Sequence, residues 1–308
     1  MGQRNFRTML ESGWGQGKFV CVGLDSTASK IPKEAYVLLK EENVEDLGGQ
    51  TAFNCNIVDA THDLVLCYKP NSAFYEARGI KGMQALYQTI RYINKVAPEL
   101  PVILDAKRAD IDSTNDGYVE AAFGELMLVA DAITVNPYFG GESLEPFFLQ
   151  KEKGIIVLCR TSNKGAKELQ ELIVDIPYTE RCEINGRLRQ PISTGVRLYQ
   201  YVAYRAATLW NRYGNCCVVV GATHPHELEC VRLIVADMPI LIPGIGAQGG
   251  DLEETLLAGK DSRGYGMIIN SSRQIIFASS GQDFAQAARA KTQELHQSIT
   301  HILKGSVS

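Results

Sequence analysis

Three charged residues stand close together in the run VILDAKRADID over 102–112: Asp105, Lys107 and Asp110. The first half of this run is apolar and predicts a buried strand, on which residues two apart point to the same face. Asp105 and Lys107 should therefore project together, with Asp110 just beyond, where the strand gives way to a loop. Charges at the mouth of a hydrophobic strand are costly to bury unless they are paired. The pattern predicts a site in which a lysine between two carboxylates is held ready as a proton donor.

Lys69 adds a further charge at the end of another apolar run, LCYKPN over 66–71. An isolated Asp-x-Lys pair is more often a structural ion pair than a site. The alternation of Lys69, Asp105, Lys107 and Asp110 changes that interpretation, because each charge is compensated while the site can still favour one proton position. Asp25, which ends the run CVGLD, either binds a sugar hydroxyl or caps the following turn.

A glycine-rich segment and an arginine predict a site for an anion. Residues 243–250, PGIGAQGG, follow an expected strand and precede a helix at Leu252, so their backbone N–H groups can approach an anion closely. Glycines also make ordinary tight turns. The next expected strand ends in NSSR over 270–273, which places the bidentate cation of Arg273 beside them. Loops after the seventh and eighth strands form the usual phosphate site of a barrel, and a phosphate grip is the prediction.

These residues must be positioned by an alternation of short apolar runs and helical segments. Expected strands cover 19–25, 64–71, 102–108, 132–138, 154–162, 215–223, 240–246 and 266–273. Expected helices cover 82–96, 113–129, 194–213, 226–236 and 283–303. Such alternation favours a parallel sheet covered by helices. Eight units in 308 residues fit one α/β domain over 1–308, a (β/α)8 TIM barrel. A doubly wound open sheet is the main rival, and periodicity alone does not separate the two.

The polar residues favour the barrel. They fall at or just after the carboxyl ends of different expected strands: Asp25, Lys69, Asp105, Lys107, Asn136, Ser162, Thr223, Gln248 and Arg273. A barrel gathers those ends on one rim, where active sites of this fold lie, whereas an open sheet spreads them along an edge. Residues 163–193 form an extended loop after the fifth strand, with Pro177, Gly186 and Pro191 among its charges. A connection of that length predicts either a lid over the site or a decorated surface insertion.

Other motifs give weaker evidence of function. His224 and His226 flank Pro225 without a further set of ligands, which favours a surface or capping role over a metal site. The eight cysteines include no CxxC pair and are expected to be reduced thiols. No pairing of a histidine with a serine or cysteine stands out for nucleophilic catalysis.

Composition limits the kinds of partner and the cellular compartment that we expect for this protein. A formal net charge of −4 and a pI of about 5.8 do not indicate nucleic acid or an acidic membrane surface as a partner. Apolar runs fall short of the span of a bilayer, and the first residues lack the apolar stretch of a secretory signal. A cytoplasmic location is expected.

The motif DAKRADI over 105–111 resembles the DxKxxDI signature of orotidine 5′-phosphate decarboxylases, and the resemblance extends along most of the chain. It includes GLD at 23–25, KPNSAFYE at 69–76, TVNPYFG at 134–140, RTSN at 160–163, VGAT at 220–223, PGIGAQGG at 243–250 and NSSR at 270–273. The sequence is similar to the longer bacterial, type 2 branch. The resemblance implies a homodimeric (β/α)8 barrel that converts orotidine 5′-monophosphate to uridine 5′-monophosphate (UMP) and CO2, with no metal, flavin or pyridoxal cofactor.

The resemblance also implies roles for individual residues. Lys107 would protonate C6 of the pyrimidine, and Asp105 would lie beside the substrate carboxylate. Residues reaching the neighbouring subunit's site would be Asp110, Ile111 and Thr114. Asp25 and Lys69 would hold the ribose. Ser162 would read the pyrimidine, although Thr161 and Asn163 are equally able hydrogen-bonding residues, while Gly246, Gln248 and Arg273 would hold the phosphate.

Two other hypotheses belong to different classes. One is a metal-dependent sugar-phosphate lyase or decarboxylase of the same barrel superfamily, such as a hexulose-phosphate synthase, which strict Mg²⁺ dependence would reveal. The other is a nucleotide-binding protein without turnover on a decayed enzyme scaffold. The charged set at Lys69, Asp105, Lys107 and Asp110 argues against both.

Overall fold

The computed structural model describes residues 4–36, 49–245 and 251–305. Eight parallel strands form one sheet in the order β2-β1-β10-β9-β8-β5-β4-β3. They are β1 (Val20–Leu24), β2 (Cys67–Pro70), β3 (Ile103–Arg108), β4 (Ala132–Val135), β5 (Gly154–Arg160), β8 (Cys216–Val220), β9 (Ile240–Pro243) and β10 (Met267–Ser271). Parallel bridges from Tyr68 to Val102 and from Asn71 to Asp105 bring the two outer strands together and close the barrel.

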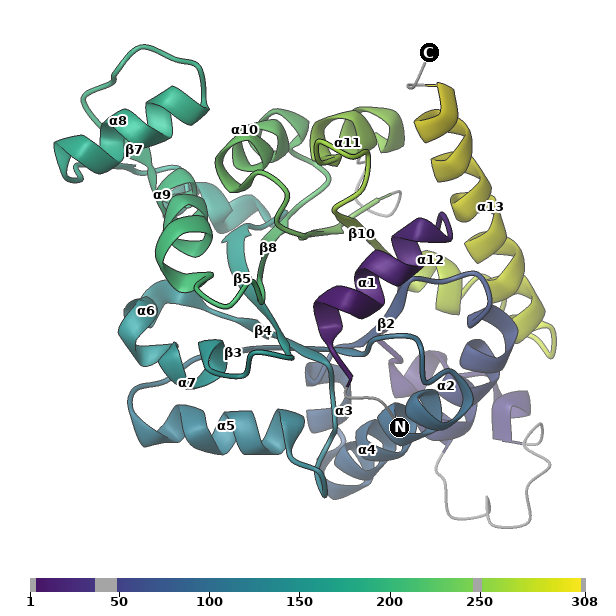
Figure 1. Cartoon of the computed structure of the whole chain (residues 1–308). Helices are drawn as coiled ribbons and strands as arrows, with labels where there is room; N and C mark the ends of the chain where they lie inside the picture. Colours follow the sequence, from purple (N-terminus) through teal and green to yellow (C-terminus); the bar gives the residue numbers. More distant parts are fainter. Residues whose placement is uncertain (1–3, 37–48, 246–250, 306–308) are drawn as a thin grey trace.

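Helices alternate with these strands and surround them (Figure 1). The longer ones are α1 (Phe6–Gly15), α2 (Gly49–Thr61), α4 (Gly79–Val96), α5 (Ser113–Phe123), α8 (Tyr178–Arg187), α9 (Leu198–Arg205), α10 (Pro225–Val235), α11 (Leu252–Gly259) and α13 (Phe284–Gly305). Short ones are α3 (Ala73–Glu76), α6 (Gly140–Ser143), α7 (Glu145–Phe148) and α12 (Arg273–Ile276), and a π-helical segment, Ala206–Trp210, extends α9. The predicted (β/α)8 TIM barrel and all eight predicted strands are confirmed. The rival prediction, a doubly wound open sheet, is wrong.

The amino end of the barrel is covered by α1, which the sequence analysis did not predict. Asn5 caps this helix by accepting a hydrogen bond from the backbone N–H of Thr8. Phe6, Leu10 and Trp14 recur at spacings of four and are buried, and the indole of Trp14 donates to the backbone oxygen of Met267 at the start of β10. Because α1 blocks this end, access to the barrel interior is left to the carboxyl ends of the strands.

Two predicted helices have different boundaries in the structure. The helix expected over 113–129 ends at Phe123, because Gly124 has an extended backbone and closes the last turn onto Glu120. The helix expected over 194–213 begins only at Leu198, because Val196–Arg197 (β7) pairs antiparallel with Ile173–Val174 (β6). Helix α2 was not predicted, since buried polar residues on it, such as Asn54, obscure the usual alternation of polar and apolar faces.

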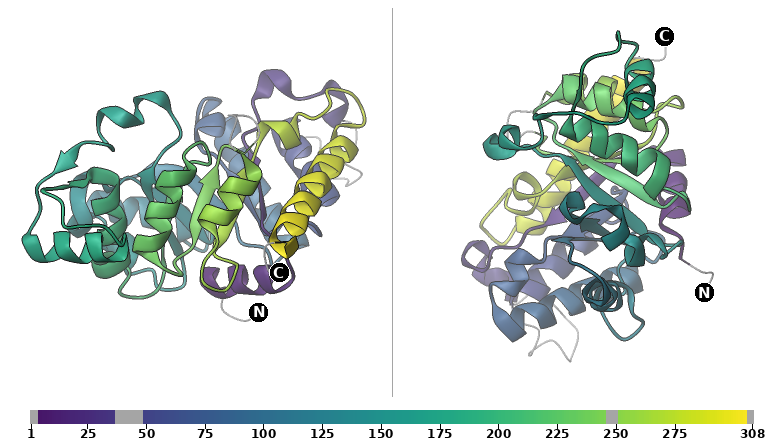
Figure 2. Two further views of the ribbon diagram at one scale, coloured as in Figure 1. Left: turned by 90° about the horizontal axis from the view of Figure 1, so that it is seen from above. Right: turned by 90° about the vertical axis from the view of Figure 1, so that its left-hand side faces the viewer.

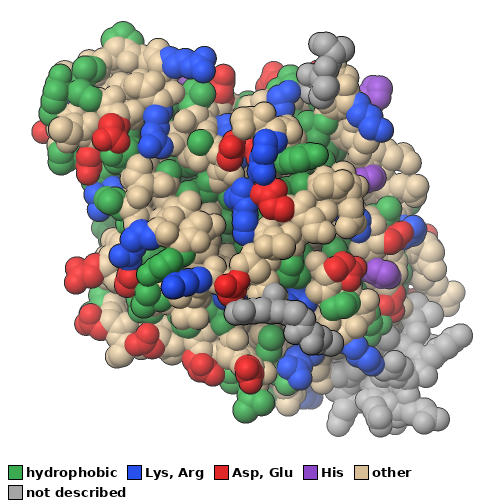
Figure 3. All heavy atoms as spheres, viewed as in Figure 1, with side chains coloured by type: hydrophobic (Ala, Val, Ile, Leu, Met, Phe, Trp, Pro, Cys, Tyr) green, Lys and Arg blue, Asp and Glu red, His purple; other side chains and the backbone are tan. Residues whose placement is uncertain are grey.

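The connection after β5 is structured. It contains a short 3-10 helix (Lys164–Glu168), the β6–β7 ladder and α8. This connection lies on the opposite side of the molecule from α13, as Figure 1 and the left view of Figure 2 show. Ile184, Leu188 and Val196 are buried, which anchors this insertion to the barrel. Several of its other apolar residues are exposed, among them Leu172 and Ile173, and apolar side chains gather over this region in Figure 3.

None of the helices in residues 4–36, 49–245 and 251–305 is long and apolar enough to cross a membrane. On the face drawn in Figure 3, acidic and basic side chains are intermixed.

Candidate active site

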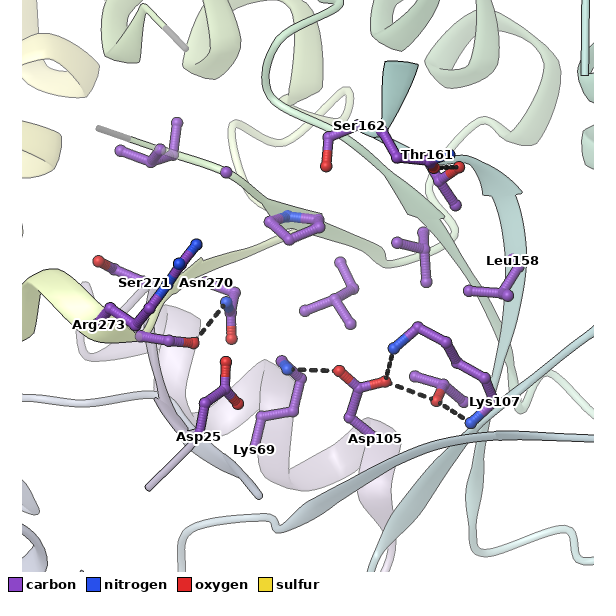
Figure 4. A pocket seen from close by; sticks show the side chains of 18 of the residues that line it. Asp25, Lys69, Asp105, Lys107, Leu158, Thr161, Ser162, Asn270, Ser271 and Arg273 are labelled. Carbon is purple, nitrogen blue, oxygen red and sulfur yellow. Dashed lines mark hydrogen bonds and ion pairs between the residues drawn. The ribbon is translucent and has the colours of Figure 1, made fainter. Parts of the chain in front are cut away.

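A cavity of about 490 Å³ opens at the carboxyl ends of the strands. Six of the predicted site residues line it, from five different strand ends: Asp25, Lys69, Asp105, Lys107, Ser162 and Arg273 (Figure 4). The barrel therefore gathers on one rim residues that are up to about 250 positions apart in sequence. Gly246 and Gln248, the other two predicted phosphate ligands, lie outside the described residues.

Asp105 is the centre of the charged cluster. Its Oδ2 accepts a hydrogen bond from Lys69 Nζ at 2.7 Å, and its Oδ1 accepts from Lys107 Nζ at 2.6 Å. The hydroxyl of Thr134 also donates to Oδ1, at 2.9 Å. Asp105 and Lys69 are buried, whereas 48% of the Lys107 side chain is exposed to the cavity and solvent. Both lysines line the cavity, and Lys107 is the more exposed of the two.

The backbone of β3 aims these side chains through an irregularity. Leu104 pairs with Ile133 and Arg108 pairs with Val135, so three residues of β3 stand opposite Thr134 alone. Lys107 accommodates the extra residues of β3 by adopting a left-handed backbone conformation, with φ of 49°. This conformation is uncommon for a residue with a side chain. Its backbone N–H donates to the Thr134 hydroxyl at 2.9 Å. The strand prediction placed both side chains on one face, and both line the cavity, but this bulge, and not regular alternation alone, directs Lys107.

The cluster keeps both buried partners charged. Burial raises the pKa of the Asp105 carboxyl, but the charges of Lys69 and Lys107 outweigh this effect and hold the pKa well below its usual value. Burial lowers the pKa of the Lys69 ammonium, but Asp105 and then Asp25 outweigh it and leave the pKa above its usual value. A buried carboxylate is therefore fixed between two ammonium groups.

Asp25 lies beside Lys69 on the side of the cavity that faces β10 (Figure 4). Its Oδ1 is buried and has no hydrogen-bond partner among the described residues. A carboxyl oxygen in that position is suited to accept a hydrogen bond from a hydroxyl group of a ligand. Asn270, Ser271 and Arg273 line the same side, next to Pro243 and Gly244 at the end of β9. This side therefore offers a guanidinium and several polar groups to an anion.

The opposite wall is formed by the end of β5 and by the insertion. Thr161, Ser162 and Asn163 all line the cavity, so all three candidates for reading the pyrimidine lie at its wall. Gln170 of the insertion lines it as well. Its side chain accepts from the Thr161 backbone N–H at 2.9 Å and donates to the Thr161 hydroxyl at 2.8 Å. Gln170 was missed from the sequence, because nothing in the pattern of residues 163–193 indicated which of them turns back to the barrel.

Asp110, Ile111 and Thr114 do not line this cavity. Asp110 begins a turn in which its backbone N–H donates to Asn115 Oδ1 at 3.0 Å and its own Oδ1 accepts from the N–H of Ile111. Ile111 is 54% exposed and Thr114 is exposed. Of the predicted alternation of four charges, a single chain therefore brings together only Lys69, Asp105 and Lys107.

Two more residues expected on the rim do not line the cavity. The side chain of Asn136 caps the turn after β4 by accepting from the Tyr138 backbone N–H at 3.1 Å. Thr223 is absent from the cavity lining, and its hydroxyl is buried without a partner among the described residues. His224 stands at the start of α10. The described ranges contain no cluster of three or more histidine, cysteine or acidic residues that could hold a metal ion.

The fold and the site define the class of the protein. It is a closed parallel barrel with a lysine–carboxylate cluster at its carboxyl rim, facing a cationic pocket. Such a protein is a barrel enzyme whose site suits an anionic substrate. The profile of the family described as "Orotidine 5'-phosphate decarboxylase / HUMPS family" matches residues 18–290. The chain belongs to this family.

Individual relatives agree with the family. A curated relative named orotidine 5′-phosphate decarboxylase, from Cellvibrio japonicus, is 45% identical over 296 residues, which covers 96% of this chain and 98% of the relative. One of the same name from Ralstonia nicotianae is 44% identical, with 96% and 97% covered. The solved structure of Leishmania donovani OMP decarboxylase matches with a TM-score of 0.73 and 34% identity, over 95% of this chain and 98% of that one.

Proposed function

We propose that this chain decarboxylates orotidine 5′-monophosphate to UMP and CO2. Membership of the family and the names of full-length relatives support the reaction. The observation that carries the proposal is the position of Lys107 Nζ, which lies 2.6 Å from Asp105 Oδ1 at the wall of the cavity. An ammonium fixed in that way can stabilise negative charge and then supply a proton.

The chemistry requires such a group. The bond between C6 and the carboxyl carbon breaks, CO2 departs, and the electron pair stays on C6, where the ring delocalises it poorly. Catalysis must stabilise this transition state more than the substrate. Lys107 faces the developing charge as an ammonium and then transfers a proton from Nζ to C6, which completes UMP.

Asp105 has two functions in this proposal. Its hydrogen bonds to Lys69 and Lys107 fix the direction of the Lys107 ammonium before substrate arrives, so little reorganisation is needed in the reaction. Its charge also lies beside the substrate carboxylate, and that repulsion is relieved when CO2 leaves. Because its pKa is held low by the two lysines, it remains a carboxylate at neutral pH.

The remaining groups hold the rest of the substrate. Asp25 and Lys69 bind ribose hydroxyls, Ser162 reads the pyrimidine, and Arg273 binds the phosphate on the side of the cavity opposite Ser162. Gly246 and Gln248 are retained as predicted phosphate ligands. Phosphate binding is remote from C6, and its binding energy can align the ring, so a substrate without phosphate should lose rate as well as affinity.

A homodimer completes the proposal. Asp110, Ile111 and Thr114 stand outside the cavity of their own chain, as residues that reach a partner's site would. No metal, flavin or pyridoxal cofactor is required by the proposed steps. A cytoplasmic location is retained, and eight cysteines that form no disulfide in the described residues suit a reducing compartment.

The test is a spectrophotometric assay that follows the absorbance specific to orotidine 5′-monophosphate, run with EDTA present. The proposal predicts turnover in EDTA at the rate found without it. Turnover of a sugar phosphate that stops in EDTA would instead favour the metal-dependent lyase, and UMP binding without turnover would favour a nucleotide-binding protein. Either result would overturn the proposed function.

A further inference from the structure

The insertion after β5 is bound to the cavity wall through two neighbouring residues, Gln170 and Glu171. Gln170 lines the cavity and makes both of its side-chain hydrogen bonds to Thr161. Glu171 Oε1 accepts from Arg160 Nη2 at 2.6 Å. Thr161 and Arg160 are also neighbours, at the end of β5, so two adjacent pairs of residues interlock.

Every hydrogen-bonding group of Thr161 is used in this arrangement. Its backbone N–H donates to Gln170 Oε1, and its hydroxyl accepts from Gln170 Nε2 while donating to Asn163 Oδ1 at 2.7 Å. Its backbone oxygen accepts from Arg160 Nη1 at 2.8 Å. Arg160 is fully buried, and its other Nη is held by Glu171. A residue so fully bonded fixes the backbone on both sides of it.

The backbone that Thr161 fixes is irregular and would otherwise be free to shift. Leu158 pairs with Val219 and Arg160 with Val220, so Cys159 is an extra residue in β5. This bulge turns the strand end toward the cavity, and beyond Arg160 no ladder hydrogen bonds to β8 hold residues 161–163. The insertion replaces that missing support with side-chain hydrogen bonds.

The segment that carries Gln170 and Glu171 is itself held from behind. The backbone N–H of Leu198 donates to Leu172 at 2.9 Å, and that of Tyr199 donates to Gln170 at 3.0 Å. These donors belong to the first turn of α9, and Tyr199 is buried. The segment is therefore fixed between α9 and β5 and transmits the rigidity of the helix to the cavity wall.

From these contacts we propose that Gln170 is a positioning residue, which acts through Thr161 to place Ser162 against the pyrimidine of the substrate. The inference rests on the proposed function. This role differs from that of a mobile lid. The part of the insertion that contacts β5 is fixed, and it supports the residues that recognise the pyrimidine. Loss of the Gln170 contacts should weaken binding of the pyrimidine and leave the ribose phosphate contacts of Asp25 and Arg273 in place.

Two ligands separate these effects. UMP carries the pyrimidine, and ribose 5-phosphate carries the same sugar phosphate without it. Calorimetry would give the affinity for UMP, and displacement of UMP would give the affinity for ribose 5-phosphate. Gln170→Met keeps the length of the side chain and removes both hydrogen bonds. This variant should lower the affinity for UMP by about tenfold, the size expected for one or two lost hydrogen bonds, and leave the affinity for ribose 5-phosphate unchanged.

Three further proteins complete the experiment. Gln190→Leu changes an exposed glutamine of the same insertion and should bind both ligands as the wild type does. Thr161→Val removes the hydroxyl that Gln170 binds, and it serves as the test if Gln170→Met does not fold. The double variant should be no weaker than Gln170→Met alone, because both changes break the same connection.

Equal losses for the two ligands, or no loss for UMP, would overturn the inference while leaving the proposed function intact. Additive losses in the double variant would overturn it too, because Gln170 would then act without Thr161. A wild-type protein that fails to bind UMP would overturn the proposed function as well, and the wild type is measured first.

Discussion

At the residue scale, the two lysines that bind Asp105 are not equivalent. Lys69 is buried against Asp105, so its loss leaves the carboxylate with one cation in place of two. Lys107 is half exposed at the cavity wall, so its ammonium can be lost with little change to the core. The buried lysine stabilises the network, and the exposed one is available for proton transfer to the substrate.

Replacing Lys107 by alanine should abolish turnover and leave the fold intact. We expect kcat to fall by at least about a thousandfold, because general-acid and electrostatic contributions are lost together. Asp105 keeps its bonds to Lys69 and Thr134, so the circular dichroism spectrum and UMP binding should persist. Lys81→Ala, an exposed lysine of α4, is the control and should retain full activity. Appreciable turnover by Lys107→Ala would refute its role as proton donor.

Asp105 should also make the stability of the protein sensitive to acid. Its pKa in the fold lies below the ordinary value of 3.8, so the unfolded chain binds more protons once the pH falls toward and below that value. Stability that is present above about pH 4 is therefore lost in acid.

Thermal unfolding between pH 6 and pH 2 would measure this effect. Asp105→Asn should be less stable near neutrality, because Lys69 loses a partner, and its stability should depend less steeply on pH in acid. Asp116→Asn, which changes an exposed residue of α5, provides the control. A slope for Asp105→Asn equal to that of the wild type would show that Asp105 is not the responsible group.

At the element scale, two bulges shape the rim. The one in β3 lies opposite Thr134 and directs Lys107, and the one in β5 falls at Cys159 and turns residues 161–163 toward the cavity. Strands that paired regularly to their ends would send alternate residues away from the barrel interior. The bulge in β5 is followed by three consecutive residues, 161–163, that all line the cavity.

Gly221, which follows β8, allows the turned end of β5 to pass close by. A Cβ at this position would lie 2.8 Å from the Cβ of Ser162 and 3.0 Å from its backbone N. Gly221→Ala should therefore displace Ser162 and raise KM for orotidine 5′-monophosphate by about tenfold, a shift of the size of one lost hydrogen bond. Steady-state kinetics would measure it.

Gly186→Ala is the matched control, because nothing lies within 4 Å of a Cβ at that position in α8. Alanine there should leave KM unchanged and raise the free energy of unfolding by about 0.5–1 kcal/mol, since glycine is a poor helix former. A Gly221→Ala enzyme with the KM of the wild type would show that the contact relaxes without moving Ser162.

At the scale of the whole molecule, one hydrophobic core extends from Phe6 to Ile299 and supports the rim. That residues 1–308 form one domain stays a prediction. The rim of a single chain holds Asp105 and Lys107 in the cavity and leaves Asp110 outside it. If the site is shared, the motif over 105–110 serves two cavities at once.

A mixing experiment tests this arrangement. Lys107→Ala and Asp110→Ala chains should each be inactive alone, and a heterodimer of the two should contain one intact site. With random exchange at equal concentrations, about a quarter of the wild-type activity should return, since half of the dimers have one good site of two. Native mass spectrometry would verify the exchange. Verified heterodimers without activity would refute shared sites.

The sequence by itself determined the barrel and the charged centre of the site. Eight apolar runs with polar residues at their ends predict eight strands and one rim, because strand period and strand direction are local properties. Asp105 and Lys107 follow from that pattern, as does Lys69 at the end of the neighbouring strand. Helix α1 was within reach too, from Asn5 and the spacing of Phe6, Leu10 and Trp14.

Only the tertiary structure decided which rim residues meet. It placed Gln170 in the cavity wall and kept Asn136, Thr223 and Asp110 out of it. These outcomes depend on bulges and on contacts between segments that pack together only after folding, such as the insertion, β5 and α9. A sequence pattern reports the face on which a side chain lies, but the partner it contacts is selected by packing across the whole barrel.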